Sequence, residues 1–157
     1  MKLSKEENKI LKLQRRLDKI RTKEKKVSIP KLKKELRKWL HRYIRTKWIV
    51  DGWGECISCK KRFPASVLQA GHYLKDGNYP RTRYEEDNIW KQCQSCNLYK
   101  GGNLTEYRIN LVEKIGESRV KELETMRHEY FKKDREWYEE KINTYKVKVS
   151  SIYEKFK

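Results

Sequence analysis

A chain of 157 residues is long enough for one modest domain with extensions and too short for two substantial hydrophobic cores. Charged residues make up 39% and hydrophobic residues 36%, so we expect a small core that needs reinforcement by a metal or a partner chain. No apolar run is long enough to cross a membrane, and the net charge of +18 favours a polyanionic partner.

The positive charge is concentrated in residues 1–50, which hold 19 Lys and Arg against 5 Asp and Glu, a net charge of +14. Residues 51–100 and 101–157 each carry a net charge of only +2. Such segregation favours an arm that binds nucleic acid. The alternatives are a solvated basic helix that binds nothing, or an arm with affinity for an acidic membrane surface. The N-terminal residues lack an apolar segment with a small-residue cleavage site, so we expect a cytoplasmic location.

Residues 1–27 show a heptad-like pattern. Leu3, Ile10 and Leu17 fall seven residues apart, and Leu13 and Ile20 each follow three residues later. The pattern predicts a short helix, either frayed or forming one side of a helical dimer contact.

Residues 28–50 are predicted to form one amphipathic helix, with Pro30 in its first turn and an end near Asp51-Gly52. Its apolar residues recur at helical spacing and are expected to face the core. The opposite face is basic and is expected to contact nucleic-acid phosphates through Lys33, Lys34, Arg37, Lys38, Arg42 and Arg45.

Short apolar runs separated by Gly, Pro, Asn and Asp predict a small β-hairpin region in residues 55–100. Gly101-Gly102 interrupts the chain, and helices are expected from Thr105 onward with a stop at Gly116. His41 and His128 are expected to be surface or interface residues. Five aromatic residues are expected in the core rather than as base-stacking platforms: Trp39, Trp48, Trp53, Trp90 and Tyr73.

The four cysteines form two C-x2-C pairs, Cys56 with Cys59 and Cys93 with Cys96. Each pair holds two thiolates close enough to share a tetrahedral ion, so together they predict a closed, structural zinc site. The alternatives are two disulfides, which a reducing cytoplasm disfavours, and a redox pair, which leaves the second pair unexplained. With four thiolates present, His72 is not needed as a zinc ligand.

Two asparagines near the second cysteine pair have more than one interpretation. Asn97 follows Cys96 directly, where its side chain would cap a helix or offer an amide oxygen to a hard cation such as Mg²⁺. Asn88 precedes Cys93 by five residues and, taken alone, is typical of a turn.

Taken together, C-x2-C, A-G-H-Y, N-I and C-x2-C-N-x2-K resemble the HNH endonucleases in their zinc-stapled, His-Me finger (ββα-metal) form. The stretches CISC, QAGHY, RYEEDNIWKQCQSCN and LVEKIG are similar to the phage NinG/Rap recombination endonuclease family, over roughly residues 56–124. The resemblance implies an α+β fold with a small, treble-clef-like zinc core flanked by long basic and polar helices. It implies a basic helical arm (1–50), a zinc-stapled HNH nuclease core (51–104) and a C-terminal helical region (105–157).

The resemblance also implies roles for individual residues. His72 matches the general base that activates water, and Asn88 matches the asparagine that braces the loop holding that histidine. Asn97 matches a ligand of the catalytic divalent ion, Mg²⁺ or Mn²⁺. Lys100 lies where the motif often has a lysine and would contact a phosphate.

Gly71 departs from the pattern, because many HNH enzymes carry a metal-binding aspartate or histidine directly before the base. Either another carboxylate, Asp76 or Asp87, helps to hold the ion, or the site binds it weakly. Arg81 and Arg83 lie beside this region in the sequence and are expected to contact phosphates.

The implied activity is a metal-dependent, structure-specific DNA endonuclease that cleaves branched recombination intermediates, Holliday junctions or D-loops. Symmetric cleavage of a junction needs two sites, so a homodimer is expected, in the host cytoplasm if the chain is phage-encoded. No small-molecule cofactor and no membrane partner are expected. The alternatives are a non-catalytic zinc-stapled nucleic-acid-binding module and an HNH nicking enzyme for ordinary duplex DNA.

Overall fold

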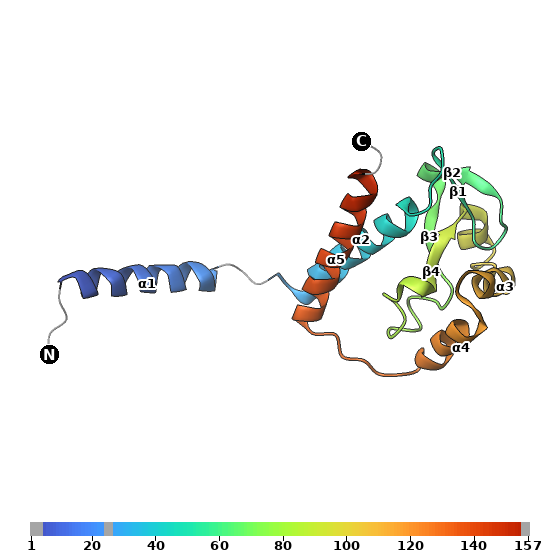
Figure 1. Cartoon of the computed structure of the whole chain (residues 1–157). Coiled ribbons are helices and arrows are strands. Elements are labelled where there is room, and N and C mark those ends of the chain that lie inside the picture. Colours follow the sequence, from blue (N-terminus) through green and yellow to red (C-terminus); the bar gives the residue numbers. More distant parts are fainter. Residues whose placement is uncertain (1–4, 24–26, 155–157) are drawn as a thin grey trace.

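The computed structural model describes residues 5–23 and 27–154, and side chains within residues 6–16 and 27–154 (Figure 1). Two small antiparallel sheets are surrounded by helices, so the expected α+β class is confirmed. The elements in chain order are α1 (Lys5–Lys23), α2 (Ile29–Thr46), β1 (Trp53–Glu55), β2 (Arg62–Pro64), η1 (Ala65–Val67), β3 (Gln69–His72), η2 (Glu86–Asn88), β4 (Ile89–Gln92), η3 (Ser95–Tyr99), α3 (Leu104–Ile115), α4 (Glu117–Met126) and α5 (Arg135–Glu154). Here η1 and η2 are short 3₁₀-helices and η3 is a short π-helix.

Helix α2 is the predicted amphipathic helix, although it ends at Thr46, earlier than the glycines suggested. Its buried residues recur every four positions, which places them on one face of the helix: Leu32, Leu36, Leu40 and Ile44. This face packs against α5, and the two helices lie side by side in Figure 1. Ile89 of β4 joins the same hydrophobic cluster, so α2 covers one side of the central sheet and α5 packs against α2.

The central sheet consists of β3 and β4, in which Gln69 pairs with Gln92, Gly71 with Trp90 and His72 with Ile89. Side chains alternate between the two faces of a strand, and directly opposed residues share a face. Gln69, Gly71 and Gln92 therefore belong to one face and His72 to the other. A shift of one residue in this register would exchange the two sets.

The second face of the sheet packs on α3 and α4. Trp90 lies there in a cluster with Tyr107 and Leu111 of α3 and Leu123 of α4. The hydroxyl of Tyr107 donates a hydrogen bond of 3.0 Å to the carbonyl of Gly71, which fixes α3 to β3. The sheet is thus held between two layers of helices.

Of the five aromatic residues that were predicted to lie in the core, two are exposed. Trp90 and Tyr73 are buried as predicted and Trp39 is half-buried, but Trp48 is 62% exposed and Trp53 is 45% exposed. The chain leaves α2 through Trp48 in a left-handed conformation (φ 53°), and the indole stacks on Trp90 with 5.0 Å between ring centroids. Placing these two tryptophans in the core was therefore wrong.

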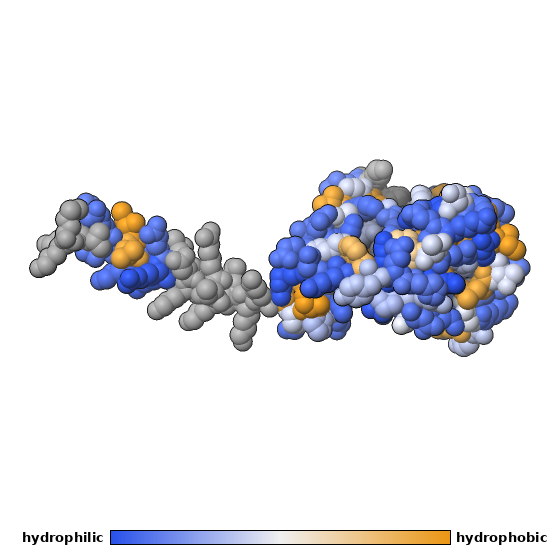
Figure 2. Space-filling view, turned by 90° about the horizontal axis from the view of Figure 1, so that it is seen from below, coloured by the Kyte–Doolittle hydropathy of each residue, from blue (hydrophilic) through white to orange (hydrophobic). Residues whose placement is uncertain are grey.

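Helix α1 is present as predicted, and its side chains Ile10 and Leu13 are exposed. Leu3 lies outside the described residues, and Leu17 and Ile20 lie outside the described side chains, so the heptad contact stays a prediction. Among the described residues, no helix is both long and apolar enough to cross a membrane. Figure 2 shows hydrophilic residues over most of the visible face, with separate hydrophobic patches between them.

Candidate functional site

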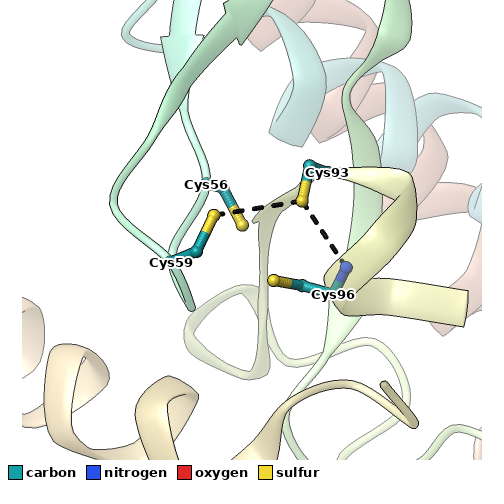
Figure 3. A group of neighbouring side chains, drawn as sticks. All are labelled: Cys56, Cys59, Cys93 and Cys96. Carbon is teal, nitrogen blue, oxygen red and sulfur yellow. Dashed lines mark hydrogen bonds between the residues drawn. The ribbon is translucent and has the colours of Figure 1, made fainter. Parts of the chain in front are cut away.

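The four cysteines lie together where the turn between β1 and β2 meets the connection from β4 to η3 (Figure 3). Their sulfur atoms all lie within 4.8 Å of one another, and none forms a disulfide. Zinc binds thiolate sulfur at about 2.3 Å in a tetrahedron, which places two sulfurs about 3.8 Å apart. The Cys59 and Cys93 sulfurs are 4.0 Å apart, so the cluster can hold a metal such as zinc, as its spacing predicted.

The cysteine cluster also fixes the segment that carries Asn97. The backbone amide of Cys96 donates to the Cys93 sulfur at 3.5 Å, and that of Asn97 donates to the Cys93 carbonyl at 3.0 Å. Asn103 donates its side-chain amide to the Cys96 sulfur at 3.8 Å. Because β4 ends directly before Cys93, one cluster positions the end of β4 and the start of η3.

His72 ends β3, and its ring is half-buried. The ring nitrogen Nε2 lies 3.1 Å from the backbone carbonyl of Arg83. A carbonyl only accepts hydrogen bonds, so Nε2 carries the hydrogen and Nδ1 is the basic nitrogen. Burial lowers the pKa of His72 to about 4, and the positive charges of Arg37 and Arg83 act in the same direction. The ring is therefore neutral near pH 7, and Nδ1 can accept a proton.

His41 lies next to His72, with 5.6 Å between the ring centroids, although the two residues are 31 positions apart. Burial lowers the pKa of His41 to about 3, helped by His72, Arg37 and Arg45. His41 was expected at the surface or in an interface; it lies on α2 and is half-buried where this helix faces the start of β3. Sequence spacing gives no signal for this contact, because it results from the packing of α2 on the sheet. His128 is exposed, as predicted.

Asn88 is fully buried, and its side chain ties together the ends of the segment between β3 and β4. Its Oδ1 accepts a hydrogen bond of 2.8 Å from the amide of Leu74, and its Nδ2 donates to the carbonyls of Leu74 and Thr82 at 3.1 Å each. Thr82 directly precedes Arg83, whose carbonyl holds the His72 ring. Asn88 thus braces the loop that positions His72.

Asn97 lies on the opposite face of β3 from the His72 side chain. Its Nδ2 donates to Oε1 of Gln69 at 2.7 Å, and its Oδ1 would lie 3.0 Å from a Cβ atom at Gly71. The side chain therefore directs its oxygen toward the backbone of β3. Lys100 is exposed at the end of η3, three residues farther along.

A hollow of about 430 Å³ separates α2 from the start of β3. It is lined mainly by basic and histidine side chains: Lys34, Arg37, Lys38, His41, Arg45 and Gln69. The hollow thus brings together four of the residues predicted to bind DNA. It also contains His41, which lies next to His72, and Gln69, which accepts a hydrogen bond from Asn97. Lys33 is exposed on the same helix, whereas Arg42 turns toward α5 and donates to the Tyr153 hydroxyl.

The two loop arginines predicted to bind phosphates have acidic partners. Arg81 pairs with Glu85 at 2.6 Å, and Arg83 pairs with Asp76 at 2.5 Å. Arg37 of α2 pairs with the same Asp76, so this carboxylate links α2 to the loop that follows His72.

The sequence resemblance offers Asp76 or Asp87 as a further ligand of the divalent ion that it implies. Asp76 is held by two arginines, and Asp87 pairs with Arg119 of α4 at 2.8 Å. Within the described residues, neither belongs to a group of three or more histidine, cysteine or acidic side chains close enough to share an ion. Both carboxylates are therefore engaged by arginine side chains.

Comparison with known proteins gives a family model described as the Bacteriophage Lambda NinG protein, which matches residues 1–155. Over 70 residues the chain is 43% identical to Protein ninG of Escherichia phage lambda, 44% to that of Salmonella phage P22 and 43% to that of Escherichia phage 933W. Each alignment covers 45% of this chain, which spans about a third (34%) of the length of these relatives. No solved structure matches. Because the family model covers nearly all residues, the chain belongs to the bacteriophage lambda NinG family.

Proposed function

We propose that the chain is a metal-dependent, structure-specific DNA endonuclease with an HNH site, acting on branched recombination intermediates such as Holliday junctions or D-loops. The observation that carries this proposal is the setting of His72. Its ring is neutral, its Nε2 is held by a backbone carbonyl, and it lies beside a hollow lined with cationic side chains. The order of β3, β4 and η3, with Asn97 on η3, matches the ββα order of the His-Me finger.

In this proposal His72 is the general base. Nδ1 takes a proton from the attacking water, and the Arg83 carbonyl then stabilises the charged ring because it accepts from Nε2–H. Asn88 keeps that carbonyl in place through its bonds to the loop. A bound divalent ion would polarise the scissile phosphate and stabilise the leaving oxygen, and Asn97 Oδ1 would be one of its ligands.

The basic face of α2 would hold the DNA. Lys34, Lys38 and Arg45 line the hollow and would contact phosphates without reading base sequence. The four cysteines would hold a structural zinc ion that fixes the position of η3 relative to β4. Symmetric cleavage of a four-way junction requires two sites, so a homodimer in the host cytoplasm is part of the proposal.

The test is incubation of the zinc-loaded protein with a four-way junction and a linear duplex of matched sequence, each with Mg²⁺, Mn²⁺ or EDTA. We expect strand cleavage near the branch point with either metal and none in EDTA, with zinc content measured before and after. Binding without cleavage under every condition would show a nucleic-acid-binding module instead. Equal cleavage of junction and duplex would show an HNH nicking enzyme for ordinary DNA.

A further inference from the structure

The side chain of Gln92 is fully buried, on the same face of the sheet as Gly71. Its Nε2 lies 2.6 Å from the hydroxyl of Ser58 and 2.7 Å from the carbonyl of Gly102. A carbonyl accepts only, so the nitrogen of the amide must face Gly102 and the oxygen must face the other way. The direction of Oε1 is therefore set by the surrounding structure.

That oxygen is buried and has no hydrogen-bond partner among the described residues. Buried amide oxygens are nearly always satisfied, because leaving one without a partner costs about 1–3 kcal/mol. Of the buried side-chain nitrogen and oxygen atoms in the described part of the chain, Gln92 Oε1 alone is left in this state. Such an oxygen is free to accept from a donor or to bind a cation.

Gly71 shows where that partner would lie. A Cβ atom at Gly71 would come 1.9 Å from Gln92 Oε1 and 3.0 Å from Asn97 Oδ1, so both amide oxygens lie within 3.0 Å of one point. Hard divalent cations bind oxygen at about 2.1 Å, which places two neighbouring ligand oxygens about 3–4 Å apart. The oxygen of Gln92 thus occupies the space that a side chain at position 71 would fill.

We propose that Gln92 is a ligand of the catalytic divalent ion and replaces, from β4, the ligand that Gly71 cannot provide. This inference rests on the proposed function and identifies a second protein ligand beside Asn97. Gln69 positions Asn97 by accepting from its Nδ2, as Ser58 and Gly102 position Gln92. Asn97 is half-buried, so the ion would enter past this residue.

Two neutral amide oxygens bind a divalent ion more weakly than a carboxylate does, because ligand charge raises the affinity for hard cations. The pair also explains why position 71 is glycine: its backbone φ does not require glycine, but any side chain there would displace Gln92. The site would therefore accept a carboxylate at position 71 only when Gln92 has been shortened.

The test is Mn²⁺ binding to the zinc-loaded, DNA-free protein, measured from the loss of the free Mn²⁺ signal in electron paramagnetic resonance. Mn²⁺ prefers oxygen ligands to thiolates and so reports on this site rather than on the cysteines. We expect one saturable site per chain and at least about tenfold weaker binding in Gln92→Ala. Gln94→Ala, which removes an exposed glutamine two residues away, is the matched control and should bind as the parent does.

A double variant keeps the inference testable if Gln92→Ala also disturbs packing. Gly71→Asp combined with Gln92→Ala should recover the Mn²⁺ affinity that Gln92→Ala loses. Gly71→Asp alone should not bind Mn²⁺ more tightly than the parent, because Gln92 occupies the space that the new side chain needs. Zinc content and thermal unfolding confirm that each variant is folded. Unchanged Mn²⁺ affinity in Gln92→Ala, no saturable Mn²⁺ site in the parent, or no recovery in a folded double variant would overturn the inference.

The outcomes also separate this inference from the proposed function. A protein that cuts junctions while Gln92→Ala binds Mn²⁺ normally retains the function and loses the ligand assignment. A protein that binds Mn²⁺ through Gln92 but cuts no DNA retains the ion site and loses the nuclease proposal.

Discussion

Asn88→Ala is the substitution whose effect follows most directly from the contacts around His72. The variant removes three hydrogen bonds inside the protein, to the amide and carbonyl of Leu74 and to the carbonyl of Thr82. The Thr82 carbonyl keeps a partner, because it also accepts from the amide of Glu85 at 3.1 Å. The two backbone groups of Leu74, itself only 5% exposed, would lose their side-chain partner.

Each buried group left without a partner costs about 1–3 kcal/mol, so we expect Asn88→Ala to lower the free energy of unfolding by about 3 kcal/mol. That is a large fraction of the 5–15 kcal/mol typical of a small domain. Urea unfolding of the zinc-loaded protein measures the difference. Asn78→Ala, at an exposed position of the same loop, is the control and should change stability by less than about 0.5 kcal/mol. A loss below about 1 kcal/mol in Asn88→Ala would refute the bracing role.

Three further outcomes are expected. Cys93→Ser should lose bound metal and the cooperative unfolding transition in circular dichroism, because a structural zinc ion contributes about 10–16 kcal/mol, as much as the whole stability of a small domain; a zinc-free variant that unfolds like the parent would contradict this. The ring of His72 should titrate near pH 4 rather than 6.5 in nuclear magnetic resonance spectra of the DNA-free protein. The free energy of unfolding should decrease as the pH is lowered from 6.5 to 4, because in this range only the unfolded chain takes up the proton. Replacing Lys34 and Lys38 by alanine should reduce the slope of log affinity against log salt by about 1.8, whereas Lys132→Ala, outside the hollow, should leave the slope unchanged.

The cysteine spacing and the helical periodicity were sufficient to predict the parts of the structure that depend on local sequence. Two C-x2-C pairs require only that the chain bring two turns together, and Cys56 and Cys93 do meet. Leu36 and Leu40 lie on the buried face of α2, because four-residue spacing determines that face whatever the helix packs against.

The parts that were missed depend on packing between distant segments. His41 meets His72 only because α2 crosses β3, and a lone histidine on a basic helix carries no sign of this. Gln92 has no motif of its own, and its unpartnered oxygen becomes visible only once the register of β3 and β4 brings it to Gly71. Trp48 was predicted to lie in the core, but the left-handed backbone conformation at this residue brings its side chain to the surface.

The central claim is that His72 is the base of a metal-dependent nuclease, and its most direct test is the single-turnover rate of cutting a four-way junction at saturating protein and Mg²⁺. We expect His72→Ala to cut at least about 100-fold more slowly than the parent, with junction affinity within about threefold, because a general base contributes about 10²–10⁴-fold. His128→Ala, which removes an exposed histidine, should cut at the parent rate. A His72→Ala protein that cuts within about tenfold of the parent would contradict the account.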